Sequence, residues 1–212
     1  PFSDPIAEGV VIQQASERAL ANGCTVDTLF DMVKRVRQEV DIPLLFMTYV
    51  NPIFVYGKTR FMEKCADCGI DGLIVPDLPF EEREELLHEC KSHGICLVSM
   101  IAPTSNERIA TIANDAEGFL YCVSSLGVTG VRSEIKTNVA DMIQQVRTVS
   151  SVPCAIGFGI STPRQAQEMS TIADGVIIGS AIVKLIAEFG TQSVEPVQQY
   201  VGEIKKALTA IR

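Results

Sequence analysis

The chain has 212 residues, 47% of them hydrophobic, and a formal net charge of −8. This length fits one large domain or two small ones, and no apolar run approaches the ~20 residues that cross a bilayer. The acidic balance argues against binding to a nucleic-acid backbone. It does not exclude a small phosphorylated ligand, because backbone amides bind phosphate without any Lys or Arg.

The first predicted element is a loop. The chain opens on PFSDPIAEG, with no initiator Met and no signal-peptide pattern, and its prolines favour irregular backbone before a helical pattern begins. A segment at the start of a chain is usually a frayed end. This one holds two carboxylates, Asp4 and Glu8, so a chemical role is a second interpretation.

Short apolar runs along the rest of the chain predict β-strands. Each run is continuous rather than alternating, which is typical of parallel strands that helices cover on both faces. The predicted strands are residues 44–49, 72–76, 96–101, 119–124, 154–158 and 176–179.

Amphipathic patterns between these runs predict helices. The clearest covers residues 25–40, with Thr25 as its N-cap and Gly23 closing the helix before it. Its apolar stripe consists of Leu29, Met32, Val33, Val36 and Val40. The other predicted helices are residues 61–68, 81–93, 106–115, 139–150, 163–172, 181–189 and 198–211, and C-terminal glycine caps are expected at Gly69 and Gly94.

The alternation of strands and helices predicts one α/β domain over residues 1–212, with a parallel sheet. A (β/α)8 TIM barrel needs eight strands and about 250 residues. The six predicted strands, and a first helix with no strand before it, therefore predict a barrel that lacks roughly its first two βα units in this chain. The opening loop then follows strand two of the barrel.

The cysteines raise the question of zinc. Cys65 and Cys68 form a CxxC motif, and His88, Cys90 and His93 follow it. A structural zinc site needs four converging ligands, commonly from turns, whereas Cys65 and Cys68 lie in a helical pattern and His88 and Cys90 cannot share a helix face. The pattern favours buried thiols and no metal. Seven cysteines, an odd number, suit a reducing compartment such as the cytoplasm.

Glycines after the last two predicted strands indicate a phosphate site. The sequence GFGIS occupies residues 157–161, and Gly179 and Ser180 precede the short apolar helix predicted at 181–189. Glycines allow close approach of an anion, and a helix N-terminus offers amides and a favourable dipole. Loops after strands seven and eight plus a short helix form the recurrent phosphate site of barrels.

Three further features at or near strand ends leave alternatives open. The glycine-rich GVTG at residues 127–130 is either a plain connection or a mobile lid. Asp77 either caps the next helix or serves the site, and Tyr121 either lines a pocket or belongs to the core.

Taken in order, the segments PFSDP, MTYVNP, IVPDLP, GVTG, GFGIS and IIGSAIV resemble the α subunit of tryptophan synthase over the whole chain. Single pieces such as GFGIS are shared with other phosphate-binding barrels, but the series is specific. The resemblance implies a lyase of tryptophan biosynthesis, which cleaves indole-3-glycerol phosphate to indole and glyceraldehyde 3-phosphate by a retro-aldol reaction. It also implies a (β/α)8 barrel that needs no cofactor of its own.

The resemblance also implies which residues form the site. One catalytic carboxylate of the family is a Glu on strand two, which would precede Pro1. The other is an Asp, where this chain has Glu8, and the extra methylene moves the carboxylate by about an ångström, which can cost on the order of a hundredfold in rate. The implied indole pocket consists of Ile12, Met47, Tyr49, Met100, Tyr121 and Phe158, with Thr129 as the lid residue that contacts the loop acid. The implied phosphate cradle consists of Gly130, Gly159, Gly179 and Ser180.

A partner is implied as well. In the family, the loops after strands two and three face a β subunit, a pyridoxal-phosphate enzyme that receives indole through a tunnel in an αββα assembly. Asp4, Asn51 and Phe54 correspond to these loops. The alternative for Phe54 is packing against its own barrel.

Two rival functions remain at this stage. Another phosphate-binding barrel, such as a sugar-phosphate isomerase, would have polar pocket residues in place of Met47, Met100 and Phe158. A barrel that only binds and activates its β subunit would have lost catalysis with Glu8. A polypeptide that began at Pro1 is expected to be inactive, because its principal acid–base Glu would be absent, and to have unpaired strand edges.

Overall fold

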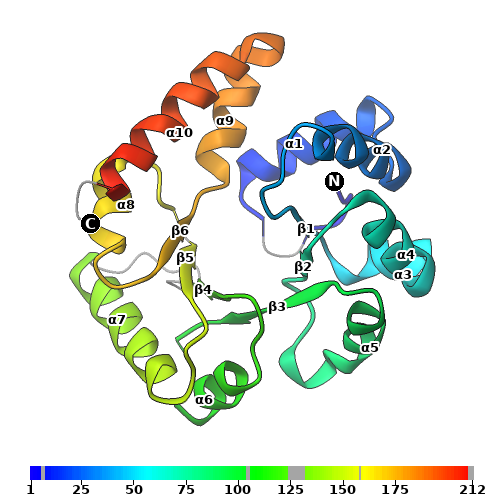
Figure 1. Cartoon of the computed structure of the whole chain (residues 1–212). Helices are drawn as coiled ribbons and strands as arrows, with labels where there is room; N and C mark the ends of the chain where they lie inside the picture. The colour runs from blue at the N-terminus through cyan, green and yellow to red at the C-terminus, as the bar shows by residue number, and fades with distance from the viewer. Residues whose placement is uncertain (6–7, 104–105, 124–131, 158, 210–212) are drawn as a thin grey trace. The chain divides into compact units, whose positions relative to one another are not determined.

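In the computed structural model, the described residues are 1–5, 8–103, 106–123, 132–157 and 159–209 (Figure 1). They form two compact units, Pro1–Val98 and Ser99–Arg212. That residues 1–212 act as one domain stays a prediction.

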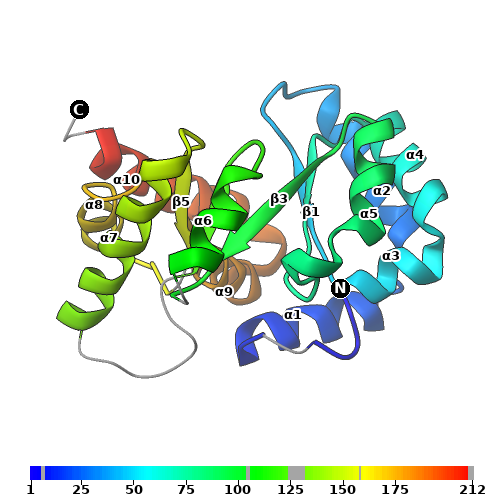
Figure 2. The same ribbon diagram turned by 90° about the horizontal axis from the view of Figure 1, so that it is seen from below.

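The strands of the first unit are short and parallel. Strand β1 (Leu45–Met47) pairs with β2 (Gly72–Ile74), and β2 pairs with the first half of β3 (Cys96–Ile101). The helices between them are α1 (Val10–Ala21), α2 (Val26–Arg37), α3 (Val50–Tyr56), α4 (Lys58–Cys68) and α5 (Glu84–Ser92), with a 3-10 turn at Phe80–Glu82. Figure 2 shows the N-terminus and α1 at the end of β1 from which α3 departs, which is its carboxyl end.

Helix α2 shows how the local sequence specifies an element. The Thr28 N–H donates to Thr25 Oγ1 at 3.2 Å, and the Thr25 N–H donates to Thr28 Oγ1 at 2.9 Å, so the predicted N-cap is confirmed as a capping box. The predicted apolar stripe is only partly right. Phe30 and Val33 are buried, whereas Met32 and Val36 are 43% and 38% exposed, because they lie on another face of the helix from Phe30.

Aromatic and sulfur-containing side chains fill the core of the first unit. The rings of Phe30 and Phe61 meet at 5.3 Å, edge to face, which joins α2 to α4. Ile53, Met62, Leu73 and Leu86 are fully buried around them. Every helix from α2 to α5 thus contributes at least one side chain to this core.

Residues 50–56 correct the sequence prediction. The resemblance implied a loop at residues 51–54, which carries Asn51 and Phe54, but these residues lie within helix α3. The reason is a cap from a distant segment: the Val50 N–H donates to Asp77 Oδ1 at 2.9 Å. Asp77 therefore does cap a helix, but the helix after β1 and not the next one along the chain.

The second unit repeats the pattern. The second half of β3 pairs with β4 (Leu120–Val123), and the sheet continues through β5 (Cys154–Gly157) to β6 (Gly175–Ile177), all parallel. The helices are α6 (Asn106–Asn114), α7 (Arg132–Val149), α8 (Pro163–Met169), α9 (Ser180–Phe189) and α10 (Val194–Thr209), with a 3-10 turn at Gly190–Gln192. Helix α6 packs against α7, and α10 packs against α8 and α9. Strands that follow one another in chain order, with helices between them, are the arrangement of a (β/α) barrel.

Arg37 ties the ends of three elements in the first unit together. Its Nε donates to the carbonyl of Gly69 at 3.0 Å, Nη1 donates to the carbonyl of Ile42 at 2.7 Å, and Nη2 contacts Asp71 Oδ2 at 2.7 Å. The same Asp71 oxygen accepts the Leu44 N–H at 2.8 Å. One guanidinium therefore fixes the C-terminus of α4 against the segment that enters β1.

Gly69→Ala is expected to destabilise the fold by about 2–4 kcal/mol. Gly69 caps α4 with a φ of +81°, which strains any other residue, and a Cβ there would lie 2.9 Å from Arg37 Nε. The matched control is Gly94→Ala, with a φ of +69° and no described atom within 4 Å of the added Cβ, so that only about 1 kcal/mol is expected. Denaturant unfolding measures both, and equal losses would contradict the steric role of Arg37.

Candidate active site

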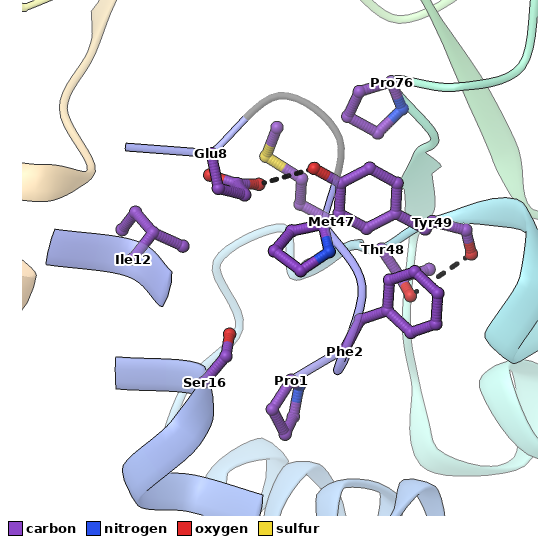
Figure 3. A pocket seen from close by; sticks show the side chains of 10 residues that line it. Pro1, Phe2, Glu8, Ile12, Ser16, Met47, Thr48, Tyr49 and Pro76 are labelled. Atoms are coloured by element: carbon purple, nitrogen blue, oxygen red, sulfur yellow. Dashed lines mark hydrogen bonds between the residues drawn. The ribbon is translucent and has the colours of Figure 1, made fainter. Parts of the chain in front are cut away.

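A pocket of about 200 Å³ opens at the carboxyl ends of β1 and β2, within the first unit (Figure 3). The opening segment and α1 form one wall, and the residues that follow the two strands form the other. The lining residues are Pro1, Phe2, Pro5, Glu8, Ile12, Ser16, Met47, Thr48, Tyr49 and Pro76. The carboxyl end of the strands is where barrel enzymes place their active sites.

Glu8 and Tyr49 form the polar centre of this pocket. The Tyr49 hydroxyl donates to Glu8 Oε1 at 3.3 Å, and Figure 3 shows the two side chains directed toward each other. Tyr49 is 5% exposed, and its ring packs on Phe2 at 5.4 Å between centroids. Gln13 Nε2 donates to the backbone carbonyl of Glu8 at 2.9 Å, which ties the loop to the first turns of α1.

Apolar side chains surround the carboxylate. Met47 is 53% exposed, and Ile12 is half-buried on α1. A carboxylate beside apolar surface can accept a hydrogen bond from the ring N–H of a flat aromatic ligand or exchange a proton with it. Four of the residues that the resemblance names, Glu8, Ile12, Met47 and Tyr49, therefore line one pocket.

The other predicted pocket residues belong to the second unit. Met100 and Tyr121 are register partners on β3 and β4. Tyr121 lies across Gly157 of β5, close enough that a Cβ on this glycine would lie 2.4 Å from the Tyr121 hydroxyl oxygen. Tyr121 thus packs over the sheet beside the start of GFGIS. Thr129, Gly130 and Phe158 lie outside the described residues.

Three of the four predicted phosphate residues lie in the described part of the chain. Gly159 follows β5 with a φ of +61°, Gly179 is the N-cap of α9, and Ser180 is the first residue of that helix. A Cβ built on Gly159 or Gly179 would meet no described atom within 4 Å. The first N–H groups of a helix have no partner within the helix. The start of α9 therefore offers both hydrogen-bond donors and open space for an anion.

Sequence reasoning missed several residues of the pocket. Phe2, Thr48 and Pro76 belong to the motifs PFSDP, MTYVNP and IVPDLP, so the motifs themselves were a signal for them. Ser16 carried no signal, because it lies on α1 in an unremarkable polar stretch. Its place in the pocket depends on how α1 lies in the folded unit.

The residues that the resemblance assigns to a partner contact lie on exposed surface. Asp4 is exposed, and Asn51 is exposed in the first turn of α3. Phe54 is 44% exposed, with Lys58 Nζ 5.3 Å from the centre of its ring, so it is not part of the core. A second cavity of about 440 Å³ lies between α2, α3 and α4 and includes Asn51 and Val55.

The thiols are buried, as the sequence predicts for the CxxC pair. Cys65, Cys68 and Cys90 are buried in the core of the first unit. Burial raises the pKa of the Cys65 and Cys90 thiols, that of Cys90 to about 12, so both stay protonated at neutral pH. Within the described ranges, no three His, Cys, Asp or Glu side chains lie close enough together to hold a metal ion. Among those same ranges, no helix is long and apolar enough to cross a membrane.

Comparison with known proteins identifies the family. The family profile described as "Tryptophan synthase alpha chain" matches residues 1–209. The tryptophan synthase alpha chain of Lacticaseibacillus casei is 45% identical over 99% of this chain and 79% of its own length. That of Shouchella clausii is 49% identical over 96% of this chain and 80% of its own length.

Solved structures agree with this assignment. The tryptophan synthase subunit alpha from Campylobacter jejuni matches with a TM-score of 0.86 and 34% identity, over 96% of this chain and 80% of the other. The tryptophan synthase a2b2 complex from Pyrococcus furiosus matches with a TM-score of 0.87 and 36% identity, over 97% and 84%. These matches confirm the predicted (β/α)8 barrel class. The chain belongs to the tryptophan synthase alpha chain family.

Proposed function

We propose that this chain cleaves indole-3-glycerol phosphate to indole and glyceraldehyde 3-phosphate, the lyase half-reaction of tryptophan synthase in tryptophan biosynthesis. The observation that carries the proposal is the family match over residues 1–209. The pocket supports it, because Glu8 stands among apolar side chains at the carboxyl end of β1 and β2.

Glu8 is proposed as the loop acid of the reaction. Cleavage needs a proton on indole C3, and the positive charge that develops on the ring then falls largely on the ring nitrogen. A carboxylate that accepts the indole N–H stabilises this charge, and it does so most strongly in a site from which water is excluded. Ile12 and Met47 would contact the faces of the indole ring. Met100, Tyr121, Phe158 and Thr129 are proposed as further substrate-binding residues on the family resemblance alone.

The phosphate end is assigned to the backbone of Gly130, Gly159, Gly179 and Ser180. The support is the start of α9 and the open space at Gly159 and Gly179. Amides and a helix dipole bind an anion without a cationic side chain, which suits an acidic chain of net charge −8.

Gly179→Ala is expected to raise KM for the substrate by on the order of tenfold, because the new methyl group occupies the space of the phosphate. The backbone of Gly179, with φ −118°, is one that other residues also adopt, so folding should be retained. Gly202→Ala on α10 is the matched control, since its Cβ also meets no described atom within 4 Å. A crystal soaked in phosphate whose anion is bound mainly by Lys or Arg side chains elsewhere would contradict the assignment.

No cofactor is assigned to this subunit, and pyridoxal phosphate is assigned to the partner β subunit. Carboxylates and amides are sufficient for the proton transfers and charge stabilisation of this cleavage. A cytoplasmic location is proposed with it, because seven reduced thiols suit a reducing compartment.

The functional test is indole release. The full-length gene product, mixed with indole-3-glycerol phosphate, is expected to release indole, and the β subunit should accelerate the release. A protein that binds its β subunit but releases no indole would support a role in binding and activation only. The family match and the apolar lining at Ile12 and Met47 leave nothing in favour of a sugar-phosphate isomerase.

The chain is proposed to assemble with its β subunit as αββα, through the surface that carries Asp4, Asn51 and Phe54. Asn51→Ala is expected to weaken the complex by about tenfold, as removal of a central contact does. Thr59→Ala, an exposed position on the next helix, is the control. Sedimentation or native electrophoresis measures both. Separate migration of the wild-type subunits at micromolar concentration would contradict the assembly.

A further inference from the structure

We propose that Tyr49 is a positioning residue for Glu8, and that its hydroxyl is what makes the longer acid usable in this active site. The inference rests on the proposed function, since it takes Glu8 to be the loop acid. It assigns a new role to Tyr49, which the sequence places only among the apolar residues of the indole pocket.

The bond between the two residues joins a firmly held donor to a loosely held acceptor. Tyr49 lies two residues after the end of β1 and is the N-cap of α3, and the next residue, Val50, is bound through its N–H to Asp77 at 2.9 Å. The ring is buried and packs on Phe2. Glu8, in contrast, lies in a loop, and its side chain carries three rotatable bonds. The 3.3 Å contact therefore fixes Glu8 and not Tyr49.

The extra methylene of Glu8 explains why such a donor is needed. A glutamate samples more positions than an aspartate, and a carboxylate misplaced by about an ångström can lose on the order of a hundredfold in rate. A hydrogen bond to one oxygen selects one of these positions. A carboxylate has two oxygens and about four acceptor sites, so the bond to Tyr49 leaves acceptor capacity for the substrate.

The test is a double-mutant cycle in the full-length protein, measured as indole release. Tyr49→Phe is expected to lower kcat about tenfold and to change KM less than twofold, because the ring stays in place and only the hydroxyl is lost. In a Glu8→Asp background, the same change is expected to lower kcat less than twofold, because the shorter side chain of aspartate does not reach the Tyr49 hydroxyl. The coupling between the two positions is the measured quantity.

Tyr56→Phe is the matched control. Its hydroxyl also donates to a carboxylate, Asp27 Oδ1 at 2.5 Å, but it lies at the second cavity and not in the pocket of Glu8. Loss of this hydroxyl should change kcat less than twofold. Unfolding midpoints of all variants establish that each is folded, which Tyr49→Phe favours because it keeps the ring on Phe2.

The outcomes distinguish a failure of the positioning role of Tyr49 from a failure of the proposed role of Glu8. Wild-type kcat in Tyr49→Phe would overturn the positioning role, and so would an equal loss in the Glu8 and Asp backgrounds, since packing or substrate contact predicts equal losses. If Glu8→Gln is as active as the wild type, the proposed role of Glu8 fails, whatever Tyr49→Phe does. A loss confined to the Glu8 background supports the inference.

Discussion

Glu8→Gln in the full-length protein is expected to lower the rate of indole release by roughly two to four orders of magnitude, the usual contribution of a general acid or base. Glutamine has nearly the shape of glutamate and can still accept the Tyr49 hydroxyl, but it carries no charge. It can therefore neither stabilise the positive charge of the protonated indole nor take up a proton. Because the substitution is isosteric, KM should change much less than kcat.

Glu8→Asp is the control for this prediction. It restores the carboxylate that the family has at this position, so activity should be retained or improved. The comparison of Gln and Asp thus separates charge from side-chain length. Equal activity of Glu8→Gln and the wild type would show that another group performs this step.

Gly157→Ala is expected to lower kcat/KM by on the order of a hundredfold and stability by about 1–3 kcal/mol. The added Cβ would lie 2.4 Å from the Tyr121 hydroxyl oxygen and 2.6 Å from two of its ring carbons. The backbone of Gly157 cannot move away from Tyr121, because β5 pairs with β4 at Val123 and with β6 at Ile177. The ring of Tyr121 must therefore leave its position, which displaces a side chain that is proposed to bind the substrate.

Gly175→Ala tests whether this effect is local. Gly175 lies on the neighbouring strand β6, and a Cβ there would meet the Cβ of Ala155 at 3.7 Å, an ordinary contact. Near-normal activity and stability are expected. If Gly157→Ala behaves like Gly175→Ala in both kinetics and unfolding, the close approach of Tyr121 does not constrain this position.

The strands could be predicted because their cause is local. Continuous apolar runs made each strand visible, and β3 matches its predicted bounds. The ends of most others differ by one or two residues, since pairing with neighbours decides where a strand stops. Thr25 as the cap of α2 was likewise readable, because both partners of its capping box lie within four residues.

Features that depend on distant residues could not be predicted in this way. Helix α3 was missed because the carboxylate that caps it, Asp77, lies 27 residues along the chain. The bond from Tyr49 to Glu8 spans 41 residues, and no periodicity or motif indicates it. The glycines proposed for the phosphate site were visible because turns and anions both require them. That they belong with the helix at residues 180–189 was inferred only from the order of the strands and helices along the chain.

The cap on α3 has a mechanical consequence. Helix α3 begins immediately after Tyr49, which holds Glu8, and its second residue is Asn51, which we assign to the partner surface. The oxygen of Asp77 anchors the residue between them. A displacement of this first turn by a bound partner would therefore be transmitted to the phenol and to the carboxylate it holds. Such coupling is reciprocal. If the substrate favours one position of that carboxylate, substrate binding would therefore change the affinity of this chain for its partner.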